Sequence, residues 1–447
     1  MKRVPLLGHA GLDDIFAWRQ DGSVTVRYFL AEAMALAACL PPGRHLLNVC
    51  QDRYHFAVGL AAGLLSGRIS LQPSSHSPET LRQIHAACPD VCCLCDSDFA
   101  SGDLPRLDFP VLVAVDPEKV AKIPDVPADQ PAIQVYTSGS TGQPLPYRKS
   151  WGSLVRNARA EASRLNVAGH AIVGTVPAQH MYGFESTVLL ALHGNAPFWS
   201  GKPFYPQDIV AALAAVPQPR LLVSTPFHLA ALLESGLELP AVDLLLSATA
   251  PLSDELASAA ETRFQAPLME IYGCTESGQI ASRRTTAGPA WELFADVRLE
   301  QEGGQTFACG GHVEGRPALA DVIEILADGR FLLHGRDADL VNIAGKRTSL
   351  AYLNHQIATI AGVRDAAFYL PEAGAATGIT RLCAFAVAPG LEAPALLQAL
   401  RERIDPIFLP RPLFLVDHLP RNDVGKLPLT ALQALHAAHA GKTHGRR

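Results

Sequence analysis

The sequence has little net charge and no long apolar run, and both absences exclude classes of protein. The 37 Lys and Arg residues against 43 Asp and Glu leave a formal net charge of −6, which provides no basic footprint for a nucleic acid. The most apolar stretch, YFLAEAMALAACL (28–40), carries Glu32 and is shorter than the ~20 residues that a membrane span needs. The opening residues MKRVPLLGHAGLDDIF lack the apolar centre of a signal peptide. We therefore expect a cytoplasmic protein with no membrane span and no nucleic-acid partner.

The lysine-bearing phosphate-binding pattern G-x-x-x-x-G-K-[ST] is also missing, although a stretch similar to a phosphate loop is present. In VYTSGSTGQPLPYRKSW (135–151), Gly142 is followed by Gln143, and Leu145 stands two residues further on. Backbone amides and hydroxyls can contact phosphate oxygens, although turns rich in Ser and Gly are also common without a ligand. The segment 137–142, expected between a strand and a helix that begins near Ser150, is thus a candidate phosphate loop whose positive charge must come from elsewhere.

Four of the nine cysteines fall in HAACPDVCCLC (85–95), for which two interpretations are open. One is a zinc or iron–sulfur site. The other is a helix that ends before Pro89 and a short buried strand over 91–95, because adjacent cysteines on a strand point to opposite faces and no second cluster is present elsewhere. Free cysteine also packs as a small apolar residue. We expect thiols here.

The order of apolar patterns predicts an α/β fold with two domains. Helical and strand patterns alternate from residue 28 and again over 155–260, which implies βαβ units and parallel sheets. After about residue 300 the strands alternate like antiparallel ones, and the end of the chain is expected to run helix–strand–strand–helix–strand. We expect a large N-terminal domain (1–336) of parallel-rich sheets with helices plus a β-rich portion, then a small α+β C-terminal domain (337–447).

Two segments place polar residues directly after predicted strands. TVPAQHMYGFES (175–186) carries His180 and Tyr182, and EIYGCTESGQI (270–280) carries Glu276. The carboxyl ends of parallel strands converge on one crevice, so these residues are expected to lie near the phosphate loop. A carboxylate beside phosphates is what Mg²⁺ needs. Taken separately, the histidine could be a core residue and the glutamate a solvated loop acid.

In this order the motifs resemble those of the adenylate-forming superfamily, which includes acyl- and aryl-CoA synthetases, nonribosomal adenylation domains and luciferases. The resemblance covers roughly residues 28–435. It is carried by seven segments: YTSGSTGQP (136–144), PAQHMYG (177–183), SATAPL (247–252), YGCTES (272–277), TFACGGHV (306–313), HGRDADLVNIAGKRTSL (334–350) and LPRNDVGKLPL (419–429).

The resemblance implies a role for each matched position. The phosphate loop would hold the β- and γ-phosphates, Ala248 and Tyr272 would flank the adenine, and Asp321 would take the ribose hydroxyls. The residues implied in binding ATP or AMP are Thr137, Ser138, Gly139, Ser140, Thr141, Gly142, Ala248, Tyr272, Gly273, Thr275, Asp321 and Arg336.

Catalysis would use Lys426, His180 and Glu276. Of these, Lys426 would bridge the acyl carboxylate and the phosphate. Magnesium would be held by Glu276 and Thr141. The acid pocket implied by the resemblance is formed by His180, Tyr182, Phe184 and Ser224. The residues implied to face the thiol acceptor, after the mobile small domain rotates, are Gly345, Lys346 and Arg347.

Three positions depart from the family pattern. Where the family often has P-K-G, this chain has PLP, and its basic residues Arg148 and Lys149 stand further downstream. Ala338 occupies the position of the acid that follows the hinge, and Asn342 that of a lysine.

The resemblance implies ATP- and Mg²⁺-dependent activation of a carboxylic acid to an acyl-AMP. The acyl group would then pass to the phosphopantetheine thiol of an acyl carrier protein or of CoA, with release of AMP and pyrophosphate. His180 stands where amino-acid-activating relatives carry Asp, which favours an aryl or medium acyl acid. The compact length and the PLPYRKSW variant resemble stand-alone ligases of aryl-polyene and xanthomonadin-type pathways. Three alternatives remain open: a catalytically silent nucleotide- or acyl-binding protein, an amino-acid-activating adenylation enzyme, and a luciferase-like oxygenase.

Overall fold

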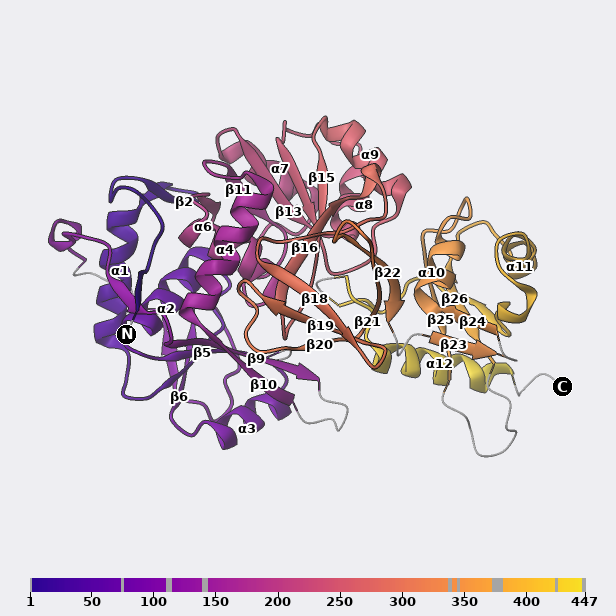
Figure 1. Ribbon diagram of the computed structural model, residues 1–447, viewed down its shortest axis with the longest axis horizontal. Helices are drawn as coiled ribbons and strands as arrows, with labels where there is room; N and C mark the ends of the chain where they lie inside the picture. The colour runs from indigo at the N-terminus through magenta and orange to yellow at the C-terminus, as the bar shows by residue number, and fades with distance from the viewer. Residues whose placement is uncertain are drawn as a thin grey trace. The chain divides into compact units, whose positions relative to one another are not determined.

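The computed structural model is described over residues 2–73, 76–109, 115–138, 144–336, 340–343, 346–371, 381–422 and 425–443. It divides into two compact units, shown in Figure 1 with the larger in indigo to salmon. Unit 1 consists of Met1–Gly288, Glu292–Glu300 and Phe307–Pro317. Unit 2 consists of Pro289–Trp291, Gln301–Thr306 and Ala318–Arg447. This division by packing places the segment from Ala318 onward in unit 2, whereas the functional boundary proposed from the sequence lies at residue 336.

The first large sheet of unit 1 has six strands. Their order is β10 (Pro144–Ser150), β9 (Pro131–Ser138), β5 (Ile69–Gln72), β4 (His45–Asn48), β6 (Val91–Cys95) and β7 (Arg106–Asp108). All neighbours are parallel except β9 and β10, which form an antiparallel hairpin. The predicted βαβ alternation is confirmed here, and the predicted cysteine strand is β6, in which all five residues are buried.

The second sheet of unit 1 has nine strands. Their order is β17 (Glu292–Leu293), β16 (Gly278–Arg284), β15 (Leu268–Cys274), β14 (Leu244–Ser247), β13 (Arg220–Ser224), β11 (Ala171–Gly174), β12 (Phe198–Trp199), β2 (Ile15–Arg19) and β3 (Gly22–Thr25). The central strands from β15 to β2 pair in parallel, and the outer strands are antiparallel. The α/β class predicted from the sequence is therefore confirmed.

Helices surround these sheets, and several begin at residues suited to capping. Asp52 accepts hydrogen bonds from the backbone N–H groups of Tyr54 and His55 at the start of α2, at 2.8 and 3.1 Å. Ser150 caps α4, and the helix begins near this residue as the sequence predicted. The helices of unit 1 are α1 (Val26–Cys39), α2 (Arg53–Leu65), α3 (Pro78–Ala87), α4 (Trp151–Leu165), α5 (Met181–Gly183), the π-helix η2 (Phe184–Leu189), α6 (Leu190–His193), α7 (Pro206–Ala215), α8 (Pro226–Glu234) and α9 (Asp254–Phe264).

On one face of the central strands, the side chains change along the strand from apolar to polar. Leu222, Leu245 and Leu268 pack beneath α7, α8 and α9, which lie along β13 and β15 in Figure 1. Two residues further along β13 and β14, Ser224 and Ser247 are paired in register and point to the same face at the carboxyl end of the sheet. The strands thus change from apolar to hydroxyl side chains where a ligand crevice is expected.

Unit 2 is built from antiparallel hairpins and a three-stranded sheet. Its strands include β21 (Asp321–Ile325) with β22 (Phe331–Arg336), β23 (Leu340–Ile343) with β24 (Lys346–Ser349), and β25 (Asp365–Tyr369), β26 (Cys383–Val387) and β27 (Leu413–Leu415). Its helices are α10 (Leu350–Ala358), α11 (Ala393–Arg401) and α12 (Leu429–Thr443). The predicted order helix–strand–strand–helix–strand is confirmed, and α12 follows it.

Shorter elements complete the described chain. They are β1 (Arg3–Pro5) paired with β8 (Asp125–Pro127), the sheet of β18 (Val297–Glu302), β19 (Gln305–Gly310) and β20 (Ala318–Leu319), and the 3₁₀ turns η1 (Pro117–Lys119), η3 (Thr285–Ala287) and η5 (Pro406–Phe408). None of the helices in the described ranges combines the length and hydropathy that a membrane crossing needs.

Three sequence expectations need correction. The phosphate-loop segment does not lead directly into a helix, because β10 lies between it and α4. Helix α8 and the N-terminal hairpin of β2 and β3 were not expected. Finally, the basic tail GKTHGRR (441–447) is expected from the sequence alone to be a solvated, frayed end, but α12 continues to Thr443.

Candidate nucleotide- and acid-binding site

The phosphate-loop segment connects the two strands of a hairpin. Thr137 and Ser138 lie at the end of β9 and pair with Leu145 and Pro144 at the start of β10. The remaining predicted residues of this loop, Gly139 to Gly142, lie outside the described residues. The segment therefore joins an antiparallel pair at one edge of the six-stranded sheet.

Close backbone packing explains the glycine of the PAQHMYG motif. The backbone N–H of His180 donates to the carbonyl of Pro177 at 3.2 Å, and this turn starts α5. A Cβ on Gly183 would lie 2.1 Å from that same carbonyl oxygen, so only glycine allows the approach. The spacing of the motif thus corresponds to one tight turn, which places His180 at the N-cap of α5.

A buried arginine holds the strand ends from which this turn departs. The Arg53 guanidinium is fully enclosed and donates four hydrogen bonds to carbonyl oxygens, at 2.8–3.1 Å. The four carbonyls belong to Trp199, Gly201, Gly174 and Val176. Because two of them lie in the chain that leads into the His180 turn, the arginine joins α2 to the carboxyl ends of β11 and β12. Local sequence patterns did not indicate this residue.

Of the four predicted acid-pocket residues, three are buried, and His180 is only partly buried. Ser224 is fully buried, and its hydroxyl lies 3.2 Å from that of Thr175. Tyr182 is buried, and burial raises the pKa of its phenol well above the ordinary value. Phe184 is also fully buried and meets Phe56 edge to face, with ring centroids 6.2 Å apart. The part that these residues play in holding an acid stays a prediction.

The adenine side of the predicted site is built at the ends of β14 and β15. Ala248 follows β14 directly, and Tyr272 lies in β15, its parallel neighbour. Thr249 adopts a φ of 79°, a left-handed conformation that a β-branched residue seldom takes. A Cβ on Gly273 would lie 2.2 Å from the carbonyl oxygen of Gly278, so the glycine of YGCTES permits the hairpin of β15 and β16. A strained backbone such as that of Thr249 is typically retained at ligand sites.

The loop that carries Thr275 and Glu276 is the turn of that hairpin. Both side chains are partly buried. The ammonium of Lys149, at the end of β10, donates to the backbone carbonyl of Glu276 at 3.0 Å. This contact connects the strand that follows the phosphate loop with the turn that carries the predicted magnesium ligand.

A buried polar cluster lies behind this turn, and the sequence interpretation did not identify it. Glu161 accepts from the Ser186 hydroxyl at 2.6 Å, and Glu185 accepts from the Asn157 amide at 2.6 Å. Burial is the main cause that raises the pKa of Glu161 to about 8 and that of Glu185 to about 7. Oriented with its nitrogen toward Glu161, the Gln279 amide lies 3.0 and 3.1 Å from the two carboxylate oxygens.

Glu161 should make stability depend on pH. Its folded-state pKa of about 8 exceeds the ordinary 4.5, so the unfolded chain releases this proton first and stability falls as pH rises between these values. We expect Glu161→Gln, which cannot ionise, to remove a loss of a few kcal/mol between about pH 5 and 8. Urea unfolding across this range measures it.

The exposed Glu238→Gln variant is the matched control and should keep the wild-type pH dependence. Subtracting the wild-type curve also removes the opposite effect of buried histidines such as His193, whose pKa burial lowers to about 3. Parallel curves for wild type and Glu161→Gln would contradict the prediction.

The residues present fit a magnesium ion bound mainly through a nucleotide. Glu276 offers a hard carboxylate oxygen, and its backbone is held from behind by Lys149. Mg²⁺ in such sites takes one or two carboxylates and completes its shell with phosphate oxygens and water. Thr141, the other predicted ligand, lies outside the described residues. In the described part of the chain, no group of three or more His, Cys, Asp or Glu side chains is arranged as a metal site.

The cysteine strand gives its thiols an apolar environment. Burial raises the pKa of Cys93 to about 12 and that of Cys95 to about 11. Because a thiolate is the form that binds metals, these shifts favour packing over ligation.

In unit 2, two of the predicted nucleotide-binding residues lie on one hairpin. Asp321 and Arg336 are directly paired residues of β21 and β22, which explains their spacing in the sequence. Lys346 and Arg347, predicted to face the thiol, lie in β24 and not in a loop. Gly345 lies outside the described residues.

Lys426 lies in a tight turn held by its own motif. Its backbone N–H donates to the Asn422 side chain at 2.9 Å, and its carbonyl accepts from the Asn422 backbone at 2.8 Å. Arg421 donates to the Gly425 carbonyl at 2.9 Å and forms a two-point ion pair with Asp365, at 2.8 and 2.7 Å. The side chain of Lys426 is exposed. The motif thus anchors this lysine's backbone to β25.

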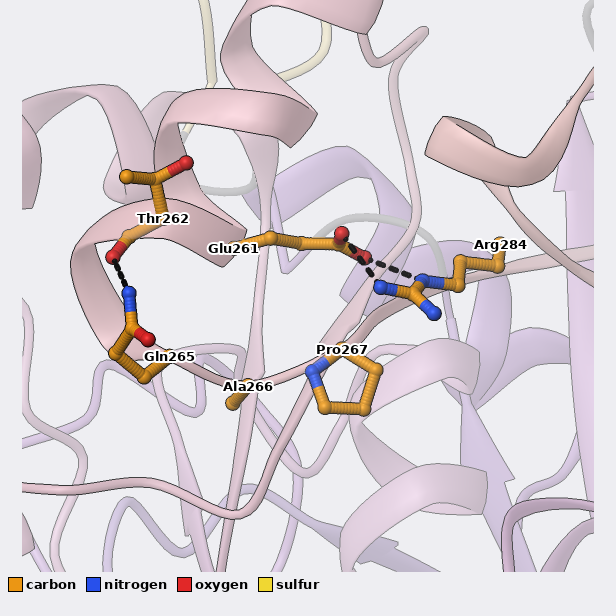
Figure 2. Close-up of a pocket in the computed structure, with 6 residues that line it drawn as sticks. All are labelled: Glu261, Thr262, Gln265, Ala266, Pro267 and Arg284. Carbon is orange, nitrogen blue, oxygen red and sulfur yellow. Dashed lines mark hydrogen bonds and ion pairs between the residues drawn. The ribbon is translucent and has the colours of Figure 1, made fainter.

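A shallow hollow of about 380 Å³ at the end of α9 is not a candidate site. Figure 2 shows Glu261 paired with Arg284 across it, at 2.8 and 2.9 Å, and Gln265 bonded to the Thr262 carbonyl at 2.6 Å. Its polar groups hold the helix end to β16.

The model of the AMP-binding enzyme family matches residues 42–311, more than half of the chain. The chain belongs to this family, and the resemblance to the adenylate-forming superfamily is confirmed. The matched range contains the phosphate loop, the His180 turn and the Glu276 turn. It ends before Asp321, Arg336 and Lys426, whose roles continue to rest on the motif resemblance.

Among curated relatives, the chain is 30% identical to a 4-coumarate–CoA ligase of Rhodobacter capsulatus, over 59% of this chain and 70% of that protein. It is 24% identical to a 4-chlorobenzoate–CoA ligase of an Arthrobacter species, over 70% of this chain and 67% of that protein. These similarities support an acid–thiol ligase.

Solved structures share the fold. ATP-bound MatB from Rhodopseudomonas palustris gives a TM-score of 0.81 at 18% identity, covering 96% of this chain and 97% of that one. The o-succinylbenzoate CoA synthetase from Bacillus subtilis, in complex with its acyl-adenylate, gives 0.80 at 19% identity, covering 97% and 99%. At these identities the likeness shows the fold alone.

Proposed function

We propose that this protein activates a carboxylic acid with ATP and transfers the acyl group to a thiol. In the first step a carboxylate oxygen attacks the α-phosphorus and pyrophosphate leaves, which gives an acyl-adenylate. In the second step a thiol attacks the acyl carbonyl and AMP leaves. The observation that carries the proposal is the family match over residues 42–311, which fully contains four of the seven motif segments named above.

The residues divide the chemistry between them. Both reactants of the first step are anions, so the site must neutralise charge and align the groups in line. Lys426 supplies a cation to the reacting oxygens, and the phosphate loop binds the phosphates through backbone and hydroxyl groups. Magnesium, held by Glu276 and Thr141, would neutralise the departing pyrophosphate. The resemblance further suggests that the small domain then rotates and brings Gly345 to Arg347 toward the thiol.

The proposed substrate is an aryl or medium acyl acid without an α-ammonium group. His180 replaces the Asp of amino-acid-activating relatives. The other nearby carboxylate, Glu185, is buried and hydrogen-bonded to Asn157, and it lies close to Lys149. It is therefore engaged inside the protein. The ligases of 4-coumarate and 4-chlorobenzoate among the relatives support an aromatic acid.

The proposed acceptor is a phosphopantetheine thiol, which CoA and acyl carrier proteins share. The names of the CoA ligase relatives support CoA. The carrier protein, like the aryl-polyene type of pathway and the cytoplasmic location, stays a prediction from the sequence.

Pyrophosphate release over a panel of aryl, fatty and amino acids tests the proposal. We expect release with aryl or medium acyl acids, and a mass shift of CoA or of a holo-carrier protein when either is added with 4-hydroxybenzoate. If ATP binds but no acid triggers release, the protein is a catalytically silent binding protein. A response confined to amino acids would instead identify an amino-acid-activating enzyme.

A further inference from the structure

Lys149 is a buried cation with a specific backbone partner. It is the second-to-last residue of β10, and only 6% of its surface is exposed. Its ammonium donates to the Glu276 carbonyl at 3.0 Å, across 127 positions of sequence. Burying an ammonium costs several kcal/mol unless charge and hydrogen bonds compensate. An apolar side chain would fill this position without that cost, so strand pairing alone does not explain a lysine.

The compensating groups meet at the base of the Glu276 turn. A Cβ on Gly278 would lie 2.8 Å from Glu185 Oε1, 3.3 Å from Asn157 Nδ2 and 3.8 Å from Lys149 Nζ. These three polar groups therefore converge on one point of the turn, which comes this close only because Gly278 has no side chain. Its φ of 74° also favours glycine.

The contact fixes a backbone atom of the residue that offers the carboxylate. A hydrogen bond to the Glu276 carbonyl restrains the peptide plane that follows this residue, and with it the direction of the side chain. Ser277 restrains the same turn, because its hydroxyl accepts from the Cys274 N–H at 3.3 Å and donates to the Gly278 carbonyl at 2.8 Å. The turn is thus held from inside the protein.

We propose that Lys149 is a positioning residue, which holds the Glu276 turn so that its carboxylate meets the magnesium ion of the bound nucleotide. The inference rests on the proposed function, since it assigns Lys149 a part in the same site. It also gives a role to the basic residue displaced downstream in PLPYRKSW. The phosphate loop lacks a lysine, and Lys149 instead provides a cation that acts on the neighbouring Glu276 turn.

The test compares Lys149→Met with Arg148→Met, its exposed neighbour on β10. We expect Lys149→Met to raise the Mg²⁺ concentration for half-maximal pyrophosphate release about tenfold, within the range for partners of metal ligands. The KM for the acid should stay unchanged. A second measurement needs no metal: backbone hydrogen exchange over 272–280 should be faster in Lys149→Met and unchanged in Arg148→Met.

The double variant Lys149→Met/Glu185→Gln guards against simple misfolding, because it leaves no unpaired buried charge. It should fold and keep the raised Mg²⁺ requirement. Unchanged Mg²⁺ dependence and exchange in Lys149→Met would overturn the inference, as would equal losses toward Mg²⁺, ATP and acid. If wild-type protein releases no pyrophosphate with any acid, the proposed function fails, whereas the exchange measurement still tests the hold on the turn.

Discussion

Replacing Lys426 by alanine should lower acid-dependent pyrophosphate exchange by about 10²- to 10³-fold, the scale for removing one preorganised group that stabilises a transition state. The reason is that two anions must approach each other and the proposed cation between them is lost. ATP binding should persist, because the phosphate loop and the Glu276 turn are untouched. Isotope exchange between pyrophosphate and ATP measures the effect.

Measuring the two half-reactions separately distinguishes the proposed role of Lys426 in adenylation from a general loss of structure. Thioester formation from a supplied acyl-adenylate should stay close to wild type in Lys426→Ala, since the proposed role of this lysine is confined to adenylation. Arg421→Gln, which breaks the contacts to Asp365 and Gly425, should lower kcat for adenylation by less and leave the KM for ATP unchanged. Equal loss of both half-reactions in Lys426→Ala would contradict the assignment.

Replacing Arg53 by methionine should destabilise unit 1 by about 3–5 kcal/mol, the range observed when one partner of a buried charged interaction is removed. The four carbonyl oxygens that this guanidinium binds would lose their donor inside the protein. Two of them precede the His180 turn, so activity should fall even where the variant remains folded. Urea unfolding followed by circular dichroism measures the loss.

Arg53→Lys and Arg44→Met complete the comparison. Lysine keeps the charge but cannot span four carbonyls, so Arg53→Lys should lie between wild type and Arg53→Met. Arg44 is exposed, and its replacement should change stability by less than about 0.5 kcal/mol. If Arg53→Met also changed the free energy of unfolding by less than about 0.5 kcal/mol, the four carbonyls must find other hydrogen-bond donors.

The sequence predicted those parts of the fold that depend on local pattern. The alternation of helices and strands, the start of a helix near Ser150 and the buried strand of cysteines all follow from periodicity and turn chemistry. Strand β10 was not expected, because Pro144 and Pro146 argue against a strand. It is the outermost strand of its sheet, where a missing N–H is tolerated, and this edge position cannot be seen in the sequence.

The interactions that hold the candidate site were harder to predict, because they join distant segments. Lys149, Glu185 and Gly278 meet only through the topology of the two sheets. One signal was available: Asn157 and Glu161 stand four residues apart on the face of α4 that also carries Leu154 and Ala158. Polar residues on an otherwise apolar face of a helix indicate a buried network.

The π-helical turn after His180 affects how this chain should be compared with its relatives. Over Phe184–Leu189 the backbone bonds span five residues, as in the contact of the Leu190 N–H with the Glu185 carbonyl. Such a turn holds one residue more than an α-helix covering the same rise. A relative with a regular helix here would need a one-residue gap in the alignment. Without that gap, every residue after the turn would be aligned with the wrong residue of the relative. In this segment, the number of residues distinguishes a π-helical turn from a regular helix, which the residue types alone do not.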